Sequence, residues 1–328
     1  MSAAIKSILV IKPSSLGDVV HTLPAVARLR AAHPEAKITW VINPEWAPLL
    51  RGNPDIDHVH IFPRGDLRGL GAPRSLIPWV VQTRALKPDV AADFQGLLRS
   101  ALIAKISGAK ECYGMSDSRE GSRWFYDHVT QVDRRAHAVD RYLELATQLG
   151  AKADSPVRFA LPTGDPLPRF DSYPPFVALH PFARGERKSL SAPVIEQLCA
   201  ALAPIRVVIV GRSSRRLGVP DNCVNLTNQT SLLQLVWVLR AAAFTISVDS
   251  GPMHIAAAVT DNLLSIHTWT DPARVGPYNR AAWIWKNGEV KRVSELDGAI
   301  GKRKRRSFRA ADIGAVLEVL REAKTLPT

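Results

Sequence analysis

The segment Phe244–Val259 (FTISVDSGPMHIAAAV) carries the side chains best suited to chemistry. Its first five residues are apolar or β-branched, which predicts a buried strand, and Pro252 suits the first turn of a following helix. Unpaired N–H groups at a helix start, together with the helix dipole, favour anion binding. The alternative is an ordinary strand–helix junction that an aspartate or serine merely caps. The residues at this junction that could bind a ligand are Asp249, Ser250, Gly251 and His254.

A second strand–turn–helix segment lies near the N-terminus. Ser7–Ile11 is strand-like, a polar turn follows, and Val19–Ala32 has helical periodicity. Ligands of an open α/β sheet bind outside the carboxyl ends of its strands, which is where Asp18 is expected. A lone carboxylate there suits a general base for a hydroxyl group. The alternative is that Asp18 only caps the helix.

Strand and helix patterns alternate in two successive sets, separated by the proline-rich segment 151–175. This arrangement predicts an α/β fold with two Rossmann-like, doubly wound domains that face each other across a cleft. We expect the N-terminal domain to span residues 1–165 and the C-terminal domain residues 172–309.

Several other segments at predicted strand ends are polar or basic. Segment 63–78 contains Arg64 and Arg68 and is predicted to be a mobile loop. Arginine side chains bind phosphate and carboxylate groups well, although a solvated surface loop is the simpler interpretation. Basic loops and a helix start suit a diphosphate, and a carboxylate on the opposite domain suits a base. Together they favour group transfer from a nucleotide-activated donor.

Composition narrows the possible functions. The net charge of +13 favours an anionic partner. The chain lacks a helix-turn-helix or RNA-binding pattern, so we expect no nucleic acid partner. Phosphate-loop, dinucleotide-binding and nucleophile-elbow motifs are absent from the sequence. Its three cysteines form no closely spaced pair, so we expect a reduced compartment and no metal site.

Four segments of the chain resemble the lipopolysaccharide heptosyltransferases, a family of inverting glycosyltransferases (glycosyltransferase family 9) with the two-domain GT-B fold. The match to both ILVIKPSSLGDVVHTL and VDSGPMHIAAA, at this separation, is specific. The resemblance implies transfer of heptose from ADP-heptose to the Kdo-lipid A inner core, with no metal and no other cofactor. A related GT-B transferase that uses another nucleotide sugar is the alternative. The matching segments are 8–23, 93–101, 248–258 and 270–278.

The resemblance also implies roles for individual residues. Asp18 matches the general base, Lys188 the lysine that binds the donor diphosphate, and Asp249 the aspartate near the sugar hydroxyls. Ser250, Gly251 and His254 match the group around the phosphates. The residues matched to the anionic acceptor are Arg64, Arg68, Gln95 and Arg119.

Departures from the family pattern lie on the donor side. Ser189 and Leu190 replace a tryptophan–proline pair, and segment 212–216 holds three arginines.

The implied acceptor is an anionic, lipid-linked saccharide. We therefore expect a cytoplasmic protein that is peripheral to the inner membrane. The basic run Lys302–Arg306 could contact that surface, or it could be an ordinary solvated segment. As is usual in GT-B enzymes, we expect helix 310–328 to pack back on the first domain.

Overall fold

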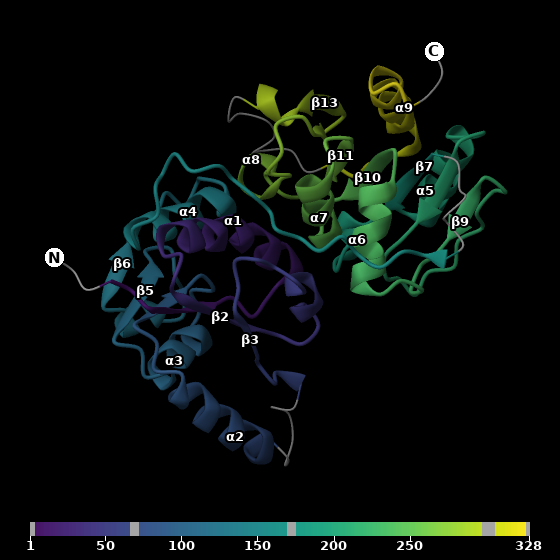
Figure 1. The fold of residues 1–328 in the computed structure, drawn as a ribbon. Coiled ribbons are helices and arrows are strands. Elements are labelled where there is room, and N and C mark those ends of the chain that lie inside the picture. The colour runs from purple at the N-terminus through teal and green to yellow at the C-terminus, as the bar shows by residue number, and fades with distance from the viewer. Residues whose placement is uncertain (1–3, 66–71, 169–174, 297–305, 326–328) are drawn as a thin grey trace. The chain divides into compact units, whose positions relative to one another are not determined.

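The computed structural model describes residues 4–65, 72–168, 175–296 and 306–325. The chain divides into two compact units, Met1–Pro162 and Thr163–Thr328 (Figure 1). The division falls inside the proline-rich segment. Each unit is an α/β structure built on one sheet, as the sequence predicts.

The first unit contains a parallel sheet with the strand order β3-β2-β1-β4-β5-β6. The helices α1 and α4 pack together on one face, and α2 and α3 pack on the other (Figure 1). Strand and helix bounds are β1 Ser7–Ile11, α1 Leu16–Ala32, β2 Lys37–Ile42, η1 Ala47–Leu50, β3 His58–Ile61, α2 Ala72–Ala85, β4 Val90–Asp93, α3 Leu98–Ile106, β5 Glu111–Met115, η3 Ser122–Phe125, β6 His128–Thr130 and α4 Ala138–Gln148.

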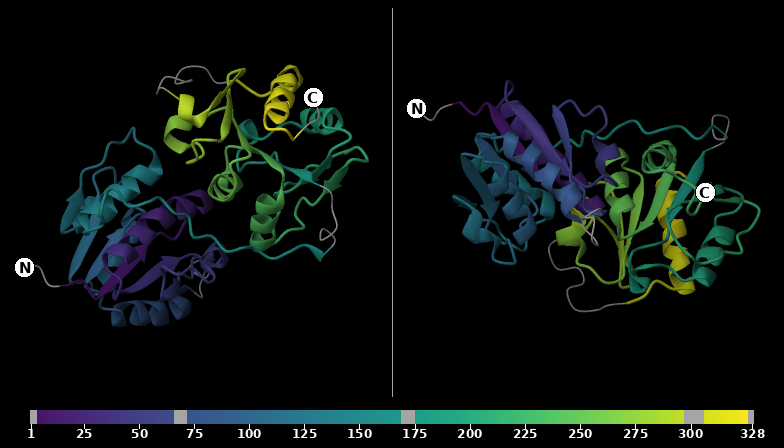
Figure 2. Two further views of the ribbon diagram at one scale, coloured as in Figure 1. Left: turned by 45° about the horizontal axis from the view of Figure 1, so that its top comes forward. Right: turned by 90° about the horizontal axis from the view of Figure 1, so that it is seen from below.

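The second unit has the strand order β13-β12-β11-β10-β7-β8-β9, parallel except for the pair β12–β13. The helices α6 and α7 lie side by side, whereas α5 and α9 share a hydrophobic core with the sheet (Figure 2). Strand and helix bounds are β7 Phe176–His180, η5 Glu186–Lys188, α5 Ala192–Ala201, β8 Arg206–Ile209, β9 Cys223–Asn225, α6 Leu232–Ala241, β10 Phe244–Val248, α7 Gly251–Val259, β11 Leu263–His267, α8 Pro272–Val275, β12 Trp283–Lys286, β13 Glu289–Arg292, η6 Val293–Glu295, η7 Ala310–Asp312 and α9 Ile313–Glu322.

The central strands explain the sequence pattern. In β10 all five residues are buried, and in β1 the last four are. A parallel strand covered by helices on both faces must be apolar at nearly every position. In both units the strand order reverses beside such a strand, between β1 and β4 and between β7 and β10. Loops diverge there, which opens a ligand crevice at the carboxyl edge of the sheet.

The terminal helix differs from expectation. The sequence predicts that helix 310–328 packs on the first domain, but α9 lies in the core of the second unit. Val316 and Leu320 are fully buried there, in one cluster with Trp285 of β12 and Ile195 of α5. The apolar residues of α9 lie on one side of the helix, and burying that side stabilises the helix. The sheet of its own unit provides the hydrophobic surface.

The basic loop is also shorter than predicted. From Ala72 onward segment 63–78 is helical, with Pro78 inside α2. The helix is held by side chains that are buried on its inner face, among them Trp79 and Thr83. Trp79 is 6% exposed, and its indole N–H donates a 2.7 Å hydrogen bond to the carbonyl of Ile61. Arg68 lies outside the described residues. Within the described residues, no helix has both the length and the apolar character needed to cross a bilayer.

The position of α9 predicts that Leu320→Ala destabilises the second unit by about 2–5 kcal/mol, the usual range for loss of a buried leucine. Hydrogen exchange, followed by mass spectrometry, should accelerate in β7, β8 and α5. The exposed Glu318→Ala in the same helix is the control and should change little. Faster exchange confined to the first unit would contradict this placement.

Candidate active site

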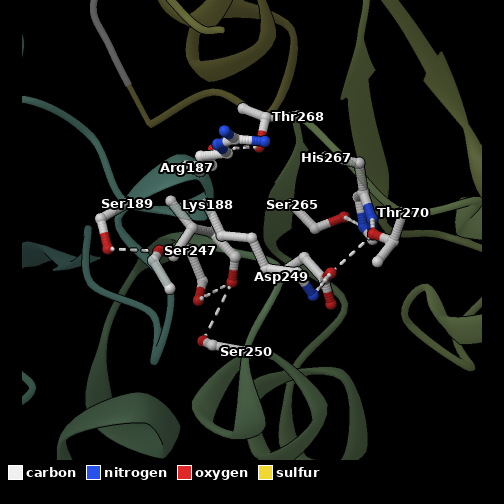
Figure 3. Close-up of polar contacts among 12 residues, drawn as sticks. Arg187, Lys188, Ser189, Ser247, Asp249, Ser250, Ser265, His267, Thr268 and Thr270 are labelled. Atoms are coloured by element: carbon white, nitrogen blue, oxygen red, sulfur yellow. Dashed lines mark hydrogen bonds and ion pairs between the residues drawn. The ribbon is translucent and has the colours of Figure 1, made fainter. Parts of the chain in front are cut away.

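An ion pair joins two loops at the switch point of the second unit. Lys188 lies in the loop after β7, and its Nζ is 2.7 Å from Oδ2 of Asp249, the residue directly after β10 (Figure 3). β7 and β10 are neighbouring parallel strands, so their carboxyl ends bring these loops together. The Lys188 side chain is 32% exposed and that of Asp249 8%, so the ammonium group can still reach a ligand.

A third loop orients the Asp249 carboxylate. The hydroxyl of Thr270 donates a 2.6 Å hydrogen bond to Oδ2 of Asp249, and Thr270 Oγ1 lies 3.0 Å from Nδ1 of His267 (Figure 3). Because the threonine proton points to the carboxylate, His267 must donate from Nδ1. Its Nε2 lies 3.0 Å from the Ser265 hydroxyl. Both of these hydrogen bonds to the carboxylate, from Lys188 and from Thr270, are to Oδ2.

The charges of this site follow from burial. Burial lowers the pKa of His267 to about 4, against the opposing effect of Asp249, so the ring is neutral at pH 7. Burial alone would raise the pKa of Asp249, but His267, Lys188 and Thr270 together hold it below its usual range. With His267 neutral, the cation that stabilises the carboxylate at pH 7 is Lys188.

The start of α7 lies beside this pair. Ser250 is the N-cap residue, but its side chain does not cap the helix. Its Oγ instead lies 3.1 Å from Nδ1 of His180 and donates to the carbonyl of Val248 at 3.1 Å. Asp249 is engaged with Lys188 and Thr270. The strand–helix junction is therefore not one that an aspartate or serine simply caps. The side chain of Ser250 makes no hydrogen bond to the first N–H groups of the helix.

The other residues that the sequence matches to the donor site lie in or beside α7. Gly251 begins α7, and His254 is buried within it at 8% exposure. His180 ends β7 and is buried, which lowers its pKa to about 4. Gly211 packs against this imidazole so closely that a β-carbon would lie 2.8 Å from the ring.

The substituted loop around Lys188 is held by bonds of its own. Ser189 Oγ accepts from the amide of Ala183 at 2.9 Å, and the Leu190 side chain is 2% exposed in the core. Arg215 donates a 2.8 Å hydrogen bond to the carbonyl of Leu190 and lies 3.4 Å from Glu186. At least one arginine of segment 212–216 is therefore structural and secures the lysine loop.

In the first unit, Asp18 occupies the N3 position of α1. Its Oδ2 accepts hydrogen bonds from the amide of Ser15 at 3.0 Å and from the hydroxyl of Ser15 at 2.7 Å. The capping role considered from sequence is thus present. The same carboxylate is only partly buried at the switch point between β1 and β4, which leaves it accessible for proton transfer.

The neighbouring loop after β4 is shaped by Asp93. Its buried carboxylate accepts from the amides of Gln95 and Gly96 at 2.8 and 3.0 Å, and from the Tyr126 hydroxyl at 2.7 Å. Burial raises the pKa of Asp93. The loop so formed places Oε1 of Gln95 3.3 Å from the amide of Ser14, which leads into α1.

Arg119 joins the same edge through its backbone. Its amide donates to the carbonyl of Gly96 at 2.8 Å, and its side chain is exposed. Gly96 has a φ of 67°, and a β-carbon there would lie 2.7 Å from Ser118 Oγ. The structure thus gathers Asp18, Gln95 and Arg119 at adjoining loops. Arg64 is exposed after the edge strand β3, which is separated from β1 by β2.

A buried cation beneath these loops was not singled out from sequence. Lys12, the residue after β1, is 2% exposed, and its Nζ donates 2.7 Å hydrogen bonds to the Phe94 carbonyl and the Tyr142 hydroxyl. Burial lowers the pKa of Lys12, but Tyr142 and the Asp18 carboxylate outweigh it, and the pKa is raised. Lys12 therefore stays charged below Asp18. A lysine that follows a strand is usually solvated, so the sequence does not predict that Lys12 is buried.

Among the described residues, no group of three histidine, cysteine, aspartate or glutamate side chains could hold a metal ion. The first unit provides a carboxylate, Asp18, at the carboxyl edge of its sheet. At the carboxyl edge of its own sheet, the second unit provides a lysine, a carboxylate and a helix start.

Comparison with known proteins shows extensive similarity. Lipopolysaccharide heptosyltransferase 1 of Escherichia coli K12 is 28% identical over 297 residues, covering 83% of this chain and 91% of the relative. The corresponding enzyme of Pseudomonas aeruginosa is 28% identical over 299 residues, covering 84% and 82%.

Solved structures agree on the fold. The heptosyltransferase WaaC of E. coli with ADP aligns with a TM-score of 0.77 and 23% identity over 97% of this chain and 99% of its own. ADP-heptose lipopolysaccharide heptosyltransferase II of E. coli gives a TM-score of 0.76 and 22% identity over 97% and 98%. The two Rossmann-like units therefore form the GT-B fold. Residues 82–297, more than half of the chain, match the profile of glycosyltransferase family 9 (heptosyltransferase), so the chain belongs to that family.

Proposed function

We propose that this glycosyltransferase transfers heptose, with inversion, from ADP-heptose to the Kdo-lipid A inner core of lipopolysaccharide. The observation that carries the proposal is the Lys188–Asp249 pair beside the start of α7. Relatives of similar length are lipopolysaccharide heptosyltransferases, and the WaaC structure was solved with ADP and with ADP-2-deoxy-2-fluoro heptose. A donor other than ADP-heptose is not favoured by these relatives.

In the proposed donor site, Lys188 and the N–H groups at the start of α7 bind the diphosphate. Ser250, Gly251 and His254 line that region. Asp249 presents Oδ1 to a hydroxyl of the sugar or ribose. As the bond between the heptose anomeric carbon and the diphosphate oxygen breaks, negative charge grows on ADP. A fixed cation and helix dipole stabilise that charge.

In the proposed acceptor site, Asp18 removes the proton from the attacking hydroxyl. The oxygen forms a new bond to the anomeric carbon on the face opposite the leaving ADP, which inverts that centre. Gln95 and Arg119 adjoin Asp18 and suit a carboxylated, phosphorylated acceptor. We keep Arg64 and Arg68 as acceptor contacts from the family resemblance.

Asp18→Asn should lower turnover roughly a hundredfold to ten-thousandfold, the usual contribution of general base catalysis, without weakening ADP binding. Turnover can be followed as ADP release and binding by calorimetry. Ser15→Ala is the matched control: it removes the hydroxyl partner of Asp18 but keeps the carboxylate, so turnover should change only a few-fold. Near-normal turnover of Asp18→Asn would reject the assignment of the base.

Lys188→Ala should weaken ADP binding about tenfold to a hundredfold, as expected for loss of a charge-assisted hydrogen bond. Calorimetry with ADP, UDP and GDP measures both the effect and the nucleotide preference. Lys110→Ala is the control, because Lys110 forms a similar ion pair at 2.7 Å with Asp89 in the first unit. If Lys188→Ala binds ADP as tightly as the unmodified protein, the proposed donor site is wrong. Tighter binding of UDP or GDP than of ADP would identify a different donor.

Because the proposed acceptor is anchored in a bilayer, we also propose that the protein is cytoplasmic and peripheral to the inner membrane. The basic run 302–306 lies outside the described residues except for Arg306. That guanidinium donates a 2.8 Å hydrogen bond to Asp312, so it belongs to the folded unit.

Serine at all four positions 302–305 should weaken sedimentation with anionic vesicles by roughly fivefold for each contacting residue. Phosphatidylcholine vesicles provide the control. Unchanged sedimentation would remove the basic run from the membrane contact.

A further inference from the structure

We propose that the outer surface formed by α2, α3 and η3 of the first unit docks on an anionic phospholipid bilayer. This inference rests on the proposed function in one respect, namely that the acceptor is a membrane lipid. We call this surface the apolar–basic face. It is defined by the exposed apolar side chains of Leu76, Ile77, Val81, Leu98, Leu102 and Trp124.

The apolar side chains of this face are unusually exposed. Trp124 is 90% exposed, and both Ile77 and Val81 are 63% exposed. Leu98 and Leu102 are 39% and 41% exposed. Isolated exposed apolar residues need no explanation, but a group of them marks an interaction site.

The six residues lie on adjoining elements. Ile77 and Val81 are four residues apart in α2, as are Leu98 and Leu102 in α3, so each pair lies on one side of its helix. Other residues of the same helices are buried. Examples are Trp79 in α2 and Ile103 in α3. The helix α3 contacts both α2 and η3, so the elements that carry these six residues adjoin one another.

The three elements of this face carry only basic charges, and two carboxylates flank them. Glu120 accepts a 3.3 Å hydrogen bond from the amide of Leu98, and Asp127 is paired with Lys105 of α3 at 3.1 Å. The sequences of α2, α3 and η3 contain no aspartate or glutamate. Arg84, Arg99 and Arg123 are exposed on these elements, and none of them forms an ion pair with a described residue. Apolar residues surrounded by arginines suit the surface of a membrane with anionic lipids: the side chains enter the interfacial region and the guanidinium groups stay at the phosphates. Tryptophan has the same preference for the interface.

A second copy of the chain fits this face less well. Symmetric dimers usually bring the same surface of two copies together, which would place arginines against arginines. Like charges across an interface disfavour association. The observed combination therefore favours an anionic partner, and a bilayer supplies both the anionic and the apolar part.

The position of the face agrees with a membrane-bound acceptor. Gln95 is three residues before Leu98, and Arg119 is three residues before η3. The apolar–basic face thus begins where the proposed acceptor loops end. A lipid whose chains stay in the bilayer under this face needs to extend only its saccharide to the sheet edge that carries Asp18.

The test compares the full-length protein with the triple variant Ile77→Ser, Val81→Ser and Trp124→Ser. Sedimentation is measured with vesicles of phosphatidylcholine that contain about one quarter phosphatidylglycerol. We expect the vesicle-bound fraction to fall at least tenfold, with ADP affinity and the thermal unfolding midpoint unchanged. Val157→Ser, which changes an exposed apolar residue outside the face, is the control and should bind like the unmodified protein.

A second pair of variants isolates the charge. Arg99→Gln and Arg123→Gln should each weaken binding to anionic vesicles by roughly fivefold and leave binding to neutral vesicles unchanged. If the triple variant sediments with anionic vesicles as strongly as the unmodified protein, the proposal is wrong. It is equally wrong if the unmodified protein binds no vesicles, or if the triple substitution only dissolves a dimer seen by analytical ultracentrifugation.

Turnover separates this inference from the proposed function. A water-soluble, deacylated acceptor should be used equally well by the unmodified protein and the triple variant, whereas an acceptor embedded in vesicles should be used at least tenfold less well by the variant. If vesicle binding depends on the face but no heptose is transferred to either acceptor, the proposed function fails and the docking surface stands.

Discussion

The candidate site of each unit depends on one constraint, the reversal of strand order beside a buried parallel strand. In the first unit the loops after β1 and β4 diverge at this reversal, and in the second unit the loops after β7 and β10 do. Short segments that follow buried strands can then hold polar side chains at a fixed spacing without disturbing the core. The strand ends bring Asp18, Asp249 and the loop of Lys188 to these edges, and hydrogen bonds of Ser189 and Arg215 then hold that loop.

Burial then decides which groups of the second unit carry charge. His180 and His267 lie at the ends of strands, and their surroundings keep both rings neutral at pH 7. They can therefore act as fixed hydrogen-bond partners for Ser250 and Thr270 without adding positive charge. Lys188 is the cation paired with the Asp249 carboxylate. The first unit shows the reverse case, since Lys12 stays charged in the interior because an anion and a tyrosine hydroxyl surround it.

Local patterns made much of this arrangement predictable. Apolar runs that lead through a polar turn into a helix identify β1–α1 and β10–α7, and hence Asp18 and Asp249. The sequence could not reveal the partners that depend on strand neighbours. Thr270 reaches Asp249 because β11 lies next to β10, and Lys12 is buried because α4 covers β1. The predicted position of the terminal helix is wrong for the same reason. Its periodicity predicts an apolar face but does not specify the sheet on which that face packs.

The bond from Arg215 to the carbonyl of Leu190 has a consequence for engineering. It links the lysine loop to a segment more than twenty residues away in the sequence, and the buried Leu190 side chain fixes the same loop from the inside. Loop 182–191 is therefore not a separable module. A chimera that exchanges this loop must exchange segment 212–216 with it, because the bond from Arg215 to the Leu190 carbonyl holds the two together.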